Sequence, residues 1–370
     1  MGVTFLLART ADRLLWGARY LERAEDTARV VRAYNDLVFD YSDELLSWEP
    51  LAALTGSLKY ADSSPDERGY VIPDGDATGE RPVVHYMLGD RSNPSSIVSS
   101  ATAARANLRT TREVMPREAW QAANHLSQYC DGAVAGAVDR GVRDRFLGRV
   151  IEICRRLDGV LESTMTRGPA YYMLRLGRLL ERADMTTRVL GVAAANALHN
   201  ERFRRESGAR EDIVIDEVQW MSVLRSVSAL QMYQRATRGP IDGLAVVNFL
   251  MTFAPFPRSV QGCFDEVRFL LAALPNSAGA LDRLAAAEGL LAQTGHDVTE
   301  GASLDRAMER IQVAIAGVAE EIYRTYVGAA LAPPDATPDA VPVLPADGPR
   351  SAGQSQRQTA AARLSPGGDA

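Results

Sequence analysis

Acidic and arginine side chains share one face of the segment at residues 18–31, which reads ARYLERAEDTARVV. At 100° per residue, these charged positions fall on a single stripe of a helix. The residues of this stripe are Arg19, Glu22, Glu25, Asp26 and Arg29. Opposite charges three and four positions apart form ion pairs on a helix. The same residue types could also hold a charged ligand or supply carboxylates to a metal ion.

A second copy of this pattern lies at residues 177–190, which read GRLLERADMTTRVL. Both copies contain Glu-Arg-Ala followed by an acid, and then a Thr and an Arg at equal spacing. The charged residues of the second copy are Arg178, Glu181, Asp184 and Arg188, and the two Glu-Arg pairs add Arg23 and Arg182. This dense match predicts an internal duplication, with the two helices paired around an approximate two-fold axis.

Three interpretations of the paired stripes remain open from the sequence. The first is a lattice of ion pairs, each contributing only a few tenths of a kcal/mol if it is exposed. The second is a polar cleft for a charged ligand. The third is a dimetal centre whose ligands would be Glu22, Glu25, Glu181 and Asp184. Known bundles of that type use Glu-x-x-His on two helices, and the neighbouring arginines would compete with a cation.

Two further segments combine a proline and a serine at a predicted helix start. In the first, Asn93 is expected to cap a helix with Pro94 at its first position. Exposed N–H groups make helix starts natural anion sites, and Arg258 adds a fork-shaped donor in the second segment. Plain capping is the alternative. The candidate binding residues here are Asn93, Ser95, Ser96, Arg258 and Ser259.

Almost the whole chain places apolar residues at three- and four-residue spacing, without alternating β-branched runs. This predicts an all-α multi-helix bundle. The expected helices are 10–40, 48–58, 81–90, 94–115, 117–138, 143–166, 169–199, 214–236, 241–254, 259–274, 279–294 and 303–327. One helical domain would occupy 1–328, as two related halves at about 1–166 and 167–328. A long polar loop is expected at 61–81, and a disordered tail rich in Pro, Ala and Gly at 329–370.

The composition is that of a folded globular protein, with 46% hydrophobic and 24% charged residues among 370. The net charge of -6 argues against a general nucleic-acid binder. Cys130, Cys154 and Cys263 form no CxxC and indicate buried thiols in a reducing cytosol. No targeting segment is recognised, and the most apolar stretch, 241–256, is too short and too interrupted to span a membrane. We therefore expect a cytoplasmic protein without membrane or nucleic-acid partners.

Self-contained catalytic motifs are missing from the sequence. It has no GxxxxGK[ST], GxGxxG or GxSxG pattern, and its four histidines share no ligand spacing. Lys59 is the only lysine, so the chain offers no phosphate-loop lysine. No cofactor is predicted, with a divalent metal as the alternative, and the sequence leaves open whether the chain is an enzyme.

Several longer segments resemble the Alpha-E family, a helical family long known only as a domain of unknown function. The resemblance covers about residues 4–328. Its segments are LLARTADRLLWGARYLERAEDTAR, NPSSI, AARANLRTTRE, STMTRGPAYYMLRLGRLLERADMTTR, LRSVSALQMYQR and FPRSV. The family's usual A-R-E-N-A-R stands here as residues 104–109, ARANLR.

The resemblance implies a setting for the protein. Alpha-E proteins are typically encoded beside, or fused to, a circularly permuted ATP-grasp ligase, often near a transglutaminase-like peptidase. It therefore implies a helical partner of a peptide or amide ligase, which binds the ligase, an amino acid or a peptide, while the ligase supplies ATP and magnesium. The alternative is a stand-alone enzyme that uses the carboxylates between the duplicated helices.

Overall fold

The computed structural model describes residues 6–40, Trp48, Leu51, Leu54, 79–207, 212–297 and 301–328. Contacts along the chain separate two units, Met1–Leu331 and Ala332–Ala370, and every described residue lies in the first. All regular secondary structure among the described residues is helical. This confirms the predicted all-α multi-helix bundle.

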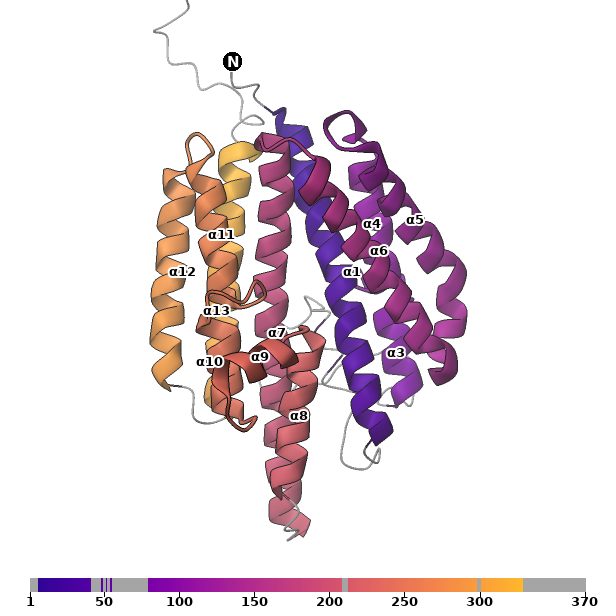
Figure 1. Ribbon diagram of the computed structural model, residues 1–370, viewed down its shortest axis with the longest axis vertical. Coiled ribbons are helices and arrows are strands. Elements are labelled where there is room, and N and C mark those ends of the chain that lie inside the picture. Colours follow the sequence, from indigo (N-terminus) through magenta and orange to yellow (C-terminus); the bar gives the residue numbers. More distant parts are fainter. Residues whose placement is uncertain are drawn as a thin grey trace, which may run out of the picture. The chain divides into compact units, whose positions relative to one another are not determined.

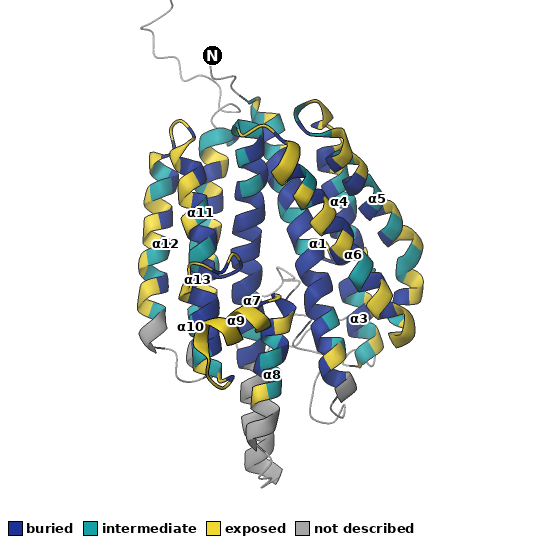
Figure 2. Cartoon of the chain, in the orientation of Figure 1, coloured by how far each residue is buried: buried dark blue, intermediate teal, exposed yellow. Residues whose placement is uncertain are grey.

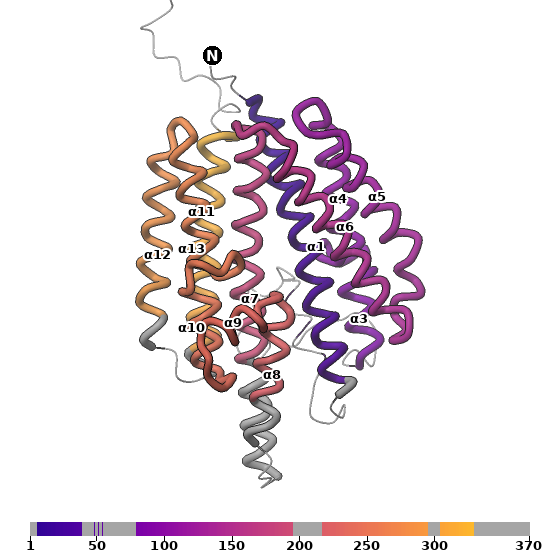
Figure 3. Tube along the Cα trace, viewed as in Figure 1, coloured from indigo at the N-terminus to yellow at the C-terminus, as the bar shows by residue number. Residues whose placement is uncertain are grey.

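Two long helices lie side by side at the centre of the helical unit: α1 (Ala8–Asp40) and α7 (Pro169–Ser207) (Figures 1 and 3). They carry the two copies of the repeated segment, which are therefore in contact as predicted. Both helices are buried along most of their described length (Figure 2). A Cβ atom added at Gly177 would overlap the carbonyl oxygen of Leu15, so glycine allows the two backbones to approach this closely.

A set of three helices accompanies each central helix. Around α1 these are α4 (Ile97–Leu108), α5 (Arg117–Ala133) and α6 (Arg140–Thr164), with α3 (Glu80–Leu88) beside them. Around α7 they are α11 (Val260–Ala272), α12 (Ala278–Asp297) and α13 (Gly301–Tyr326). In each set the first and third helices lie on the central helix, and the second packs on both of them. The duplication itself stays an inference from the repeated sequence.

A single helix predicted at 214–236 is in fact two, α8 (Asp212–Ser226) and α9 (Leu230–Thr237). Ser228 adopts a left-handed backbone with φ 55°, which ends the first helix. The sequence has no glycine or proline there to indicate the break. α10 (Gly243–Thr252) follows, and α8 packs against both α1 and α7.

The helix predicted at 94–115 is also too long. Ser96 caps α4 by accepting a hydrogen bond from the Ser99 amide, so Asn93 is not the cap and Pro94 is not the first helical residue. At the other end, the hydroxyls of Thr110 and Thr111 donate to carbonyls of the last turn. These local side-chain bonds compete with continued helix. A separate 3₁₀ turn, η4 (Arg112–Val114), follows.

The helix predicted at 117–138 changes type after Ala133, where the 3₁₀ helix η5 (Val134–Val138) begins. Gly132 and Gly136 flank the change, and glycine weakens an α-helix. Most of 48–58 and 61–81, and all of 329–370, lie outside the described residues. None of the described helices has the length and apolar character needed to cross a membrane.

Candidate functional site

Reciprocal ion pairs join the two central helices where the repeated segments meet. On one side, Glu22 of α1 accepts hydrogen bonds from Arg178 and Arg182 of α7, the latter with Nε at 2.7 Å from Oε1. On the other, Glu181 of α7 accepts from Arg19 and Arg23 of α1, with Arg19 Nε at 2.8 Å. Each helix thus gives one glutamate and two arginines at the same spacing. Both glutamates are fully buried.

Arg258, just before α11, adds a third segment to this site. Its guanidinium lies 3.2 Å from Glu22 Oε1 and 2.6 Å from Asp26 Oδ1. Its backbone carbonyl accepts a hydrogen bond of 3.0 Å from the hydroxyl of Thr186 on α7. Arg258 therefore links the start of α11 to both central helices.

Glu25 and Arg29 extend the site toward the C-terminal end of α1. Glu25 accepts from Arg29 one turn later and from Arg178 of α7, whose Nη2 is 3.0 Å from Oε2. Arg29 also donates to the hydroxyl of Ser228 in the α8–α9 turn. We call the whole set the ion-pair cluster. It consists of Arg19, Glu22, Arg23, Glu25, Asp26, Arg29, Arg178, Glu181, Arg182 and Arg258.

Burial and neighbouring charges set the ionisation of the two central glutamates. Burial opposes the charged form of Glu22, but the arginines around it outweigh that effect and hold its pKa well below the ordinary value. The pKa of Glu181 is lowered in the same way, with burial opposed by Arg23 and Arg19. Both glutamates are therefore carboxylates at neutral pH and have charge-assisted partners.

Asp26 behaves differently from the two glutamates. Burial raises its pKa from 3.8 to about 6, and the negative charges of Glu22 and Glu25 add to that effect. Arg258 opposes the rise but does not cancel it. Asp26 thus takes up a proton more readily than Glu22 or Glu181 does.

This geometry favours the lattice of ion pairs among the three interpretations. Every cluster carboxylate lies against at least one guanidinium, which leaves little room for a charged ligand. In the described part of the chain, no three His, Cys, Asp or Glu side chains gather as a metal site would require. In particular, the four carboxylates considered as dimetal ligands form no such group.

The other candidate residues lie on local structural elements. Asp184 pairs with Arg188 one turn along α7, at 2.7 Å. Asn93 accepts a hydrogen bond from the Ser95 amide, and Ser96 caps α4. Ser259 caps α11 by accepting from the Gly262 amide at 2.9 Å. The weak bond from Arg23 to Ser95, at 3.5 Å, connects the first helix start to the ion-pair cluster.

Sequence reasoning missed a buried charge outside the ion-pair cluster, Arg143 on α6. Its side chain is fully buried and donates to Glu80, to Asn35 and to two backbone carbonyls. Asp158, which pairs with Arg178, was missed as well. Arg143 and Asp158 each pair with a side chain on another helix, and a single sequence carries no signal for such a pairing.

A known family profile matches most of the chain. The Alpha-E profile, described as a predicted alpha-helical domain with a conserved ER motif, matches residues 6–327. Glu22-Arg23 and Glu181-Arg182 are the Glu-Arg pairs that meet in the ion-pair cluster.

Two similar proteins are known only as uncharacterized, one from Mycobacterium bovis and one from Mycobacterium tuberculosis. Each is 25% identical over 285 residues, which is 73% of this chain and 30% of the relative. The chain thus spans less than a third of the length of these relatives. No solved structure matches it.

Proposed function

The chain belongs to the Alpha-E family, and on this basis we propose that it is a helical partner protein of an ATP-grasp-type ligase. The ligase would join an amine to a carboxylate in a peptide or amide bond. The helical protein binds the ligase, its amino-acid or peptide substrate, or both, and the ligase brings ATP and magnesium.

The proposal rests chiefly on the pairing of the charged residues in the two repeated helices. Glu22 and Glu181 are fully buried and bound by arginines of the opposite helix. Such side chains hold helices in register and are not free to transfer protons or bind metal. The stand-alone enzyme that would use these carboxylates is therefore the less supported alternative.

Two further features support a role beside a nucleotide-using enzyme. The chain has one lysine and no GxxxxGK[ST] sequence, which fits a partner that supplies the ATP site. The similar mycobacterial proteins carry much additional chain beside the matched region, as expected for a module that works with another domain. The three cysteines are free and buried, which fits the cytoplasm as the proposed location.

The test is capture of the partner from native lysate at moderate salt. The tagged full chain is bound to beads, and the retained proteins are identified by mass spectrometry, with tag alone as control. We expect an ATP-grasp protein to be enriched over the control. The purified pair should then turn over ATP in the presence of candidate amino acids faster than the ligase alone.

Either of two results would count against the proposal. One is failure to enrich the ligase from a lysate in which it is detected directly. The other is ATP turnover by the ligase that is the same with and without the helical protein.

A further inference from the structure

The two buried glutamates of the ion-pair cluster differ in the number of arginines around them. Glu22 has three arginine partners, and Arg258 is the one that comes from outside the central helices. In the described part of the chain, Glu181 has two, Arg19 and Arg23. The Glu181 side of the cluster therefore lacks the third guanidinium that closes the Glu22 side.

Ser95 occupies, before α4, the position that Arg258 occupies before α11. Each of them directly precedes a serine that caps a helix, Ser96 in one case and Ser259 in the other. Ser95 also contacts the ion-pair cluster, because its hydroxyl accepts the bond of 3.5 Å from Arg23. This hydroxyl donates to no described residue, and Ser95 itself is buried. A short neutral side chain thus stands where the other side of the cluster has a long cation.

The acid that binds this cation is missing from the Glu181 side as well. Asp26 corresponds to Met185 in the second copy of the repeated segment. Asp184, the neighbour of Met185, attracts Arg23, but it is itself paired with Arg188 at 2.7 Å. The Glu181 side consequently has two arginines for one carboxylate of its own, an excess of one positive charge.

Several hydrogen-bond donors on this side have no acceptor among the described residues. Arg19 donates to Glu181 through Nε alone, and Arg23 leaves Nη2 without an acceptor. The two arginine side chains are 15% and 19% exposed, whereas Glu181 is fully buried. Their guanidinium groups lie over aromatic rings, Arg19 at 4.9 Å from Trp16 and Arg23 at 5.5 Å from Tyr20. These contacts hold the free donors in place where solvent reaches the side chains.

This arrangement is suited to a carboxylate. A guanidinium fork donates two parallel hydrogen bonds to the two oxygens of a carboxylate, and the Ser95 hydroxyl is a further donor. A single negative charge also matches the excess positive charge. A dianion such as phosphate would bring a second negative charge close to the buried Glu181 without a cation to compensate it.

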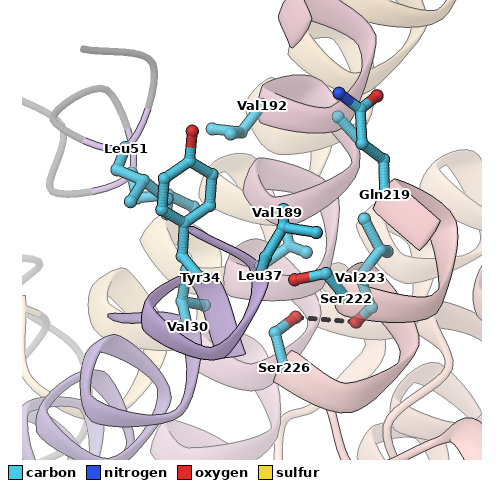
Figure 4. A pocket seen from close by; sticks show the side chains of 12 residues that line it. Val30, Tyr34, Leu37, Leu51, Val189, Val192, Gln219, Ser222, Val223 and Ser226 are labelled. Atoms are coloured by element: carbon cyan, nitrogen blue, oxygen red, sulfur yellow. Dashed lines mark hydrogen bonds between the residues drawn. The ribbon is translucent and has the colours of Figure 1, made fainter. Parts of the chain in front are cut away.

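The cavity between α1, α7 and α8 is not an alternative place for such a ligand (Figure 4). Its volume of about 40 Å³ holds about three water-sized groups, which is too little for an amino acid. Its lining includes Val30, Val189 and Val223, whose side chains offer a carboxylate no hydrogen bond.

We propose that Arg19, Arg23 and Ser95 bind the carboxylate of an amino acid or peptide. The free guanidinium donors of both arginines and the serine hydroxyl hold the two carboxylate oxygens. The ligand thereby supplies the negative charge that Asp26 supplies on the Glu22 side. This inference rests on the proposed function, because it names the chemical group by which the helical protein would hold an amino acid or peptide for the ligase.

The experiment titrates the purified full chain with small probes at low ionic strength, without the ligase, and follows binding by ligand-observed NMR. N-acetyl-L-alanine is the carboxylate probe, and N-acetyl-L-alaninamide is its neutral match. We expect saturable binding of the carboxylate at millimolar affinity, which is usual for so small a ligand. The amide should bind at least tenfold more weakly. Inorganic phosphate, added as a competitor, should bind more weakly than the carboxylate.

Two pairs of variants test the location. Ser95→Asp places a carboxylate beside Arg23 and should abolish binding of the carboxylate probe, whereas Ser95→Asn, which has the same size and no charge, should retain it. Arg23→Lys keeps the charge beside Glu181 but lacks the fork, so it should weaken the probe at least fivefold. Its control is Arg117→Lys, the same substitution at an exposed position of α5, which should leave binding unchanged. Thermal unfolding verifies that each variant is folded.

The proposal is overturned if the carboxylate probe does not saturate, if the amide binds equally well, or if phosphate binds more tightly. It is also overturned if Ser95→Asp binds the probe as well as Ser95→Asn does, a comparison that decides even if Arg23→Lys does not fold. These results concern the isolated chain, so they leave partner capture standing. Conversely, a failed capture with intact probe binding removes the ligase and keeps the carboxylate site.

Discussion

At Glu22, guanidinium groups from three arginines converge on one buried carboxylate, and they come from two separate parts of the chain. The equivalent position on the other helix, Glu181, has two arginine partners. Removing the charge from such a carboxylate leaves buried cations without compensation, which costs far more than losing an exposed ion pair. Substitutions at these residues should therefore change the stability of the fold first.

We predict that Glu22→Gln lowers the free energy of unfolding by about 3–5 kcal/mol, because Arg178, Arg182 and Arg258 lose their shared counter-charge. Urea unfolding followed by circular dichroism measures the change. Glu118→Gln, at an exposed position of α5, is the control and should have almost no effect. Equal stability of the two variants would show that the cluster is not a structural lattice.

The raised pKa of Asp26 predicts that the stability of the protein depends on pH. Its pKa in the folded protein, about 6, lies above the ordinary 3.8, so the folded state binds more protons between these values. Its contribution to stability is therefore complete below about pH 4 and is lost as pH rises through about 6. Glu22 and Glu181, with lowered pKa values, act in the opposite direction and only at lower pH.

The variant Asp26→Asn cannot ionise, so it should gain stability relative to the wild type as pH rises from 5 to 7. The shift implies a gain of about 1 kcal/mol over this interval. Urea unfolding of both proteins at a series of pH values measures it. A difference between them that stays constant with pH would contradict the raised pKa.

At the scale of elements, the crossing of α1 and α7 depends on small residues as well as on charge. The backbones meet at Gly177 and Leu15, next to Arg178 and one turn before Glu181. The arginines reach across to the opposite helix because the helices are this close. A larger side chain at the crossing would therefore disturb both the packing and the ion pairs.

We predict that Gly177→Ala lowers the free energy of unfolding by about 1–3 kcal/mol through overpacking against the Leu15 carbonyl. The matched control is Gly159→Ala on α6, where an added Cβ meets nothing within 4 Å. There the substitution should stabilise the helix by about 0.5–1 kcal/mol. Thermal and urea unfolding compare the two, and a tolerated Gly177→Ala would mean that the crossing is looser than described.

At the scale of the whole helical unit, each half contributes one side of a shared buried surface. The helices packed around α1 and those packed around α7 are joined through the ion-pair cluster between the two central helices. Arg258 also links the start of α11 to α1. Neither half satisfies its buried charges without the other. The two halves should therefore be stable only together.

We predict that the two halves unfold in one transition. Two variants each keep a single tryptophan, either Trp120 on α5 or Trp220 on α8, with the other three changed to Phe. Because the buried charges couple the halves, fluorescence of the two reporters should give the same urea midpoint. Separated midpoints would show independently folding halves.

Sequence pattern alone predicts the helical class, most helix positions and the repeated charged segment. These are local properties, because period and charge spacing are written into a few successive turns. The pairing of the two repeated helices also followed from the repeat, although the sequence could not choose among the three uses of the stripe. It did not predict the break at Ser228, where a left-handed residue ends α8 without any glycine or proline to indicate it.

The role of the charged residues depends on how the helices pack in three dimensions. Whether Glu22 is a ligand or a buried ion-pair partner depends on how close Arg178, Arg182 and Arg258 come, and these lie more than 150 positions away in the sequence. The same holds for Arg143, whose partner Glu80 is on another helix. Burial and long-range proximity fix both pairing and pKa, and both arise only when distant helices pack.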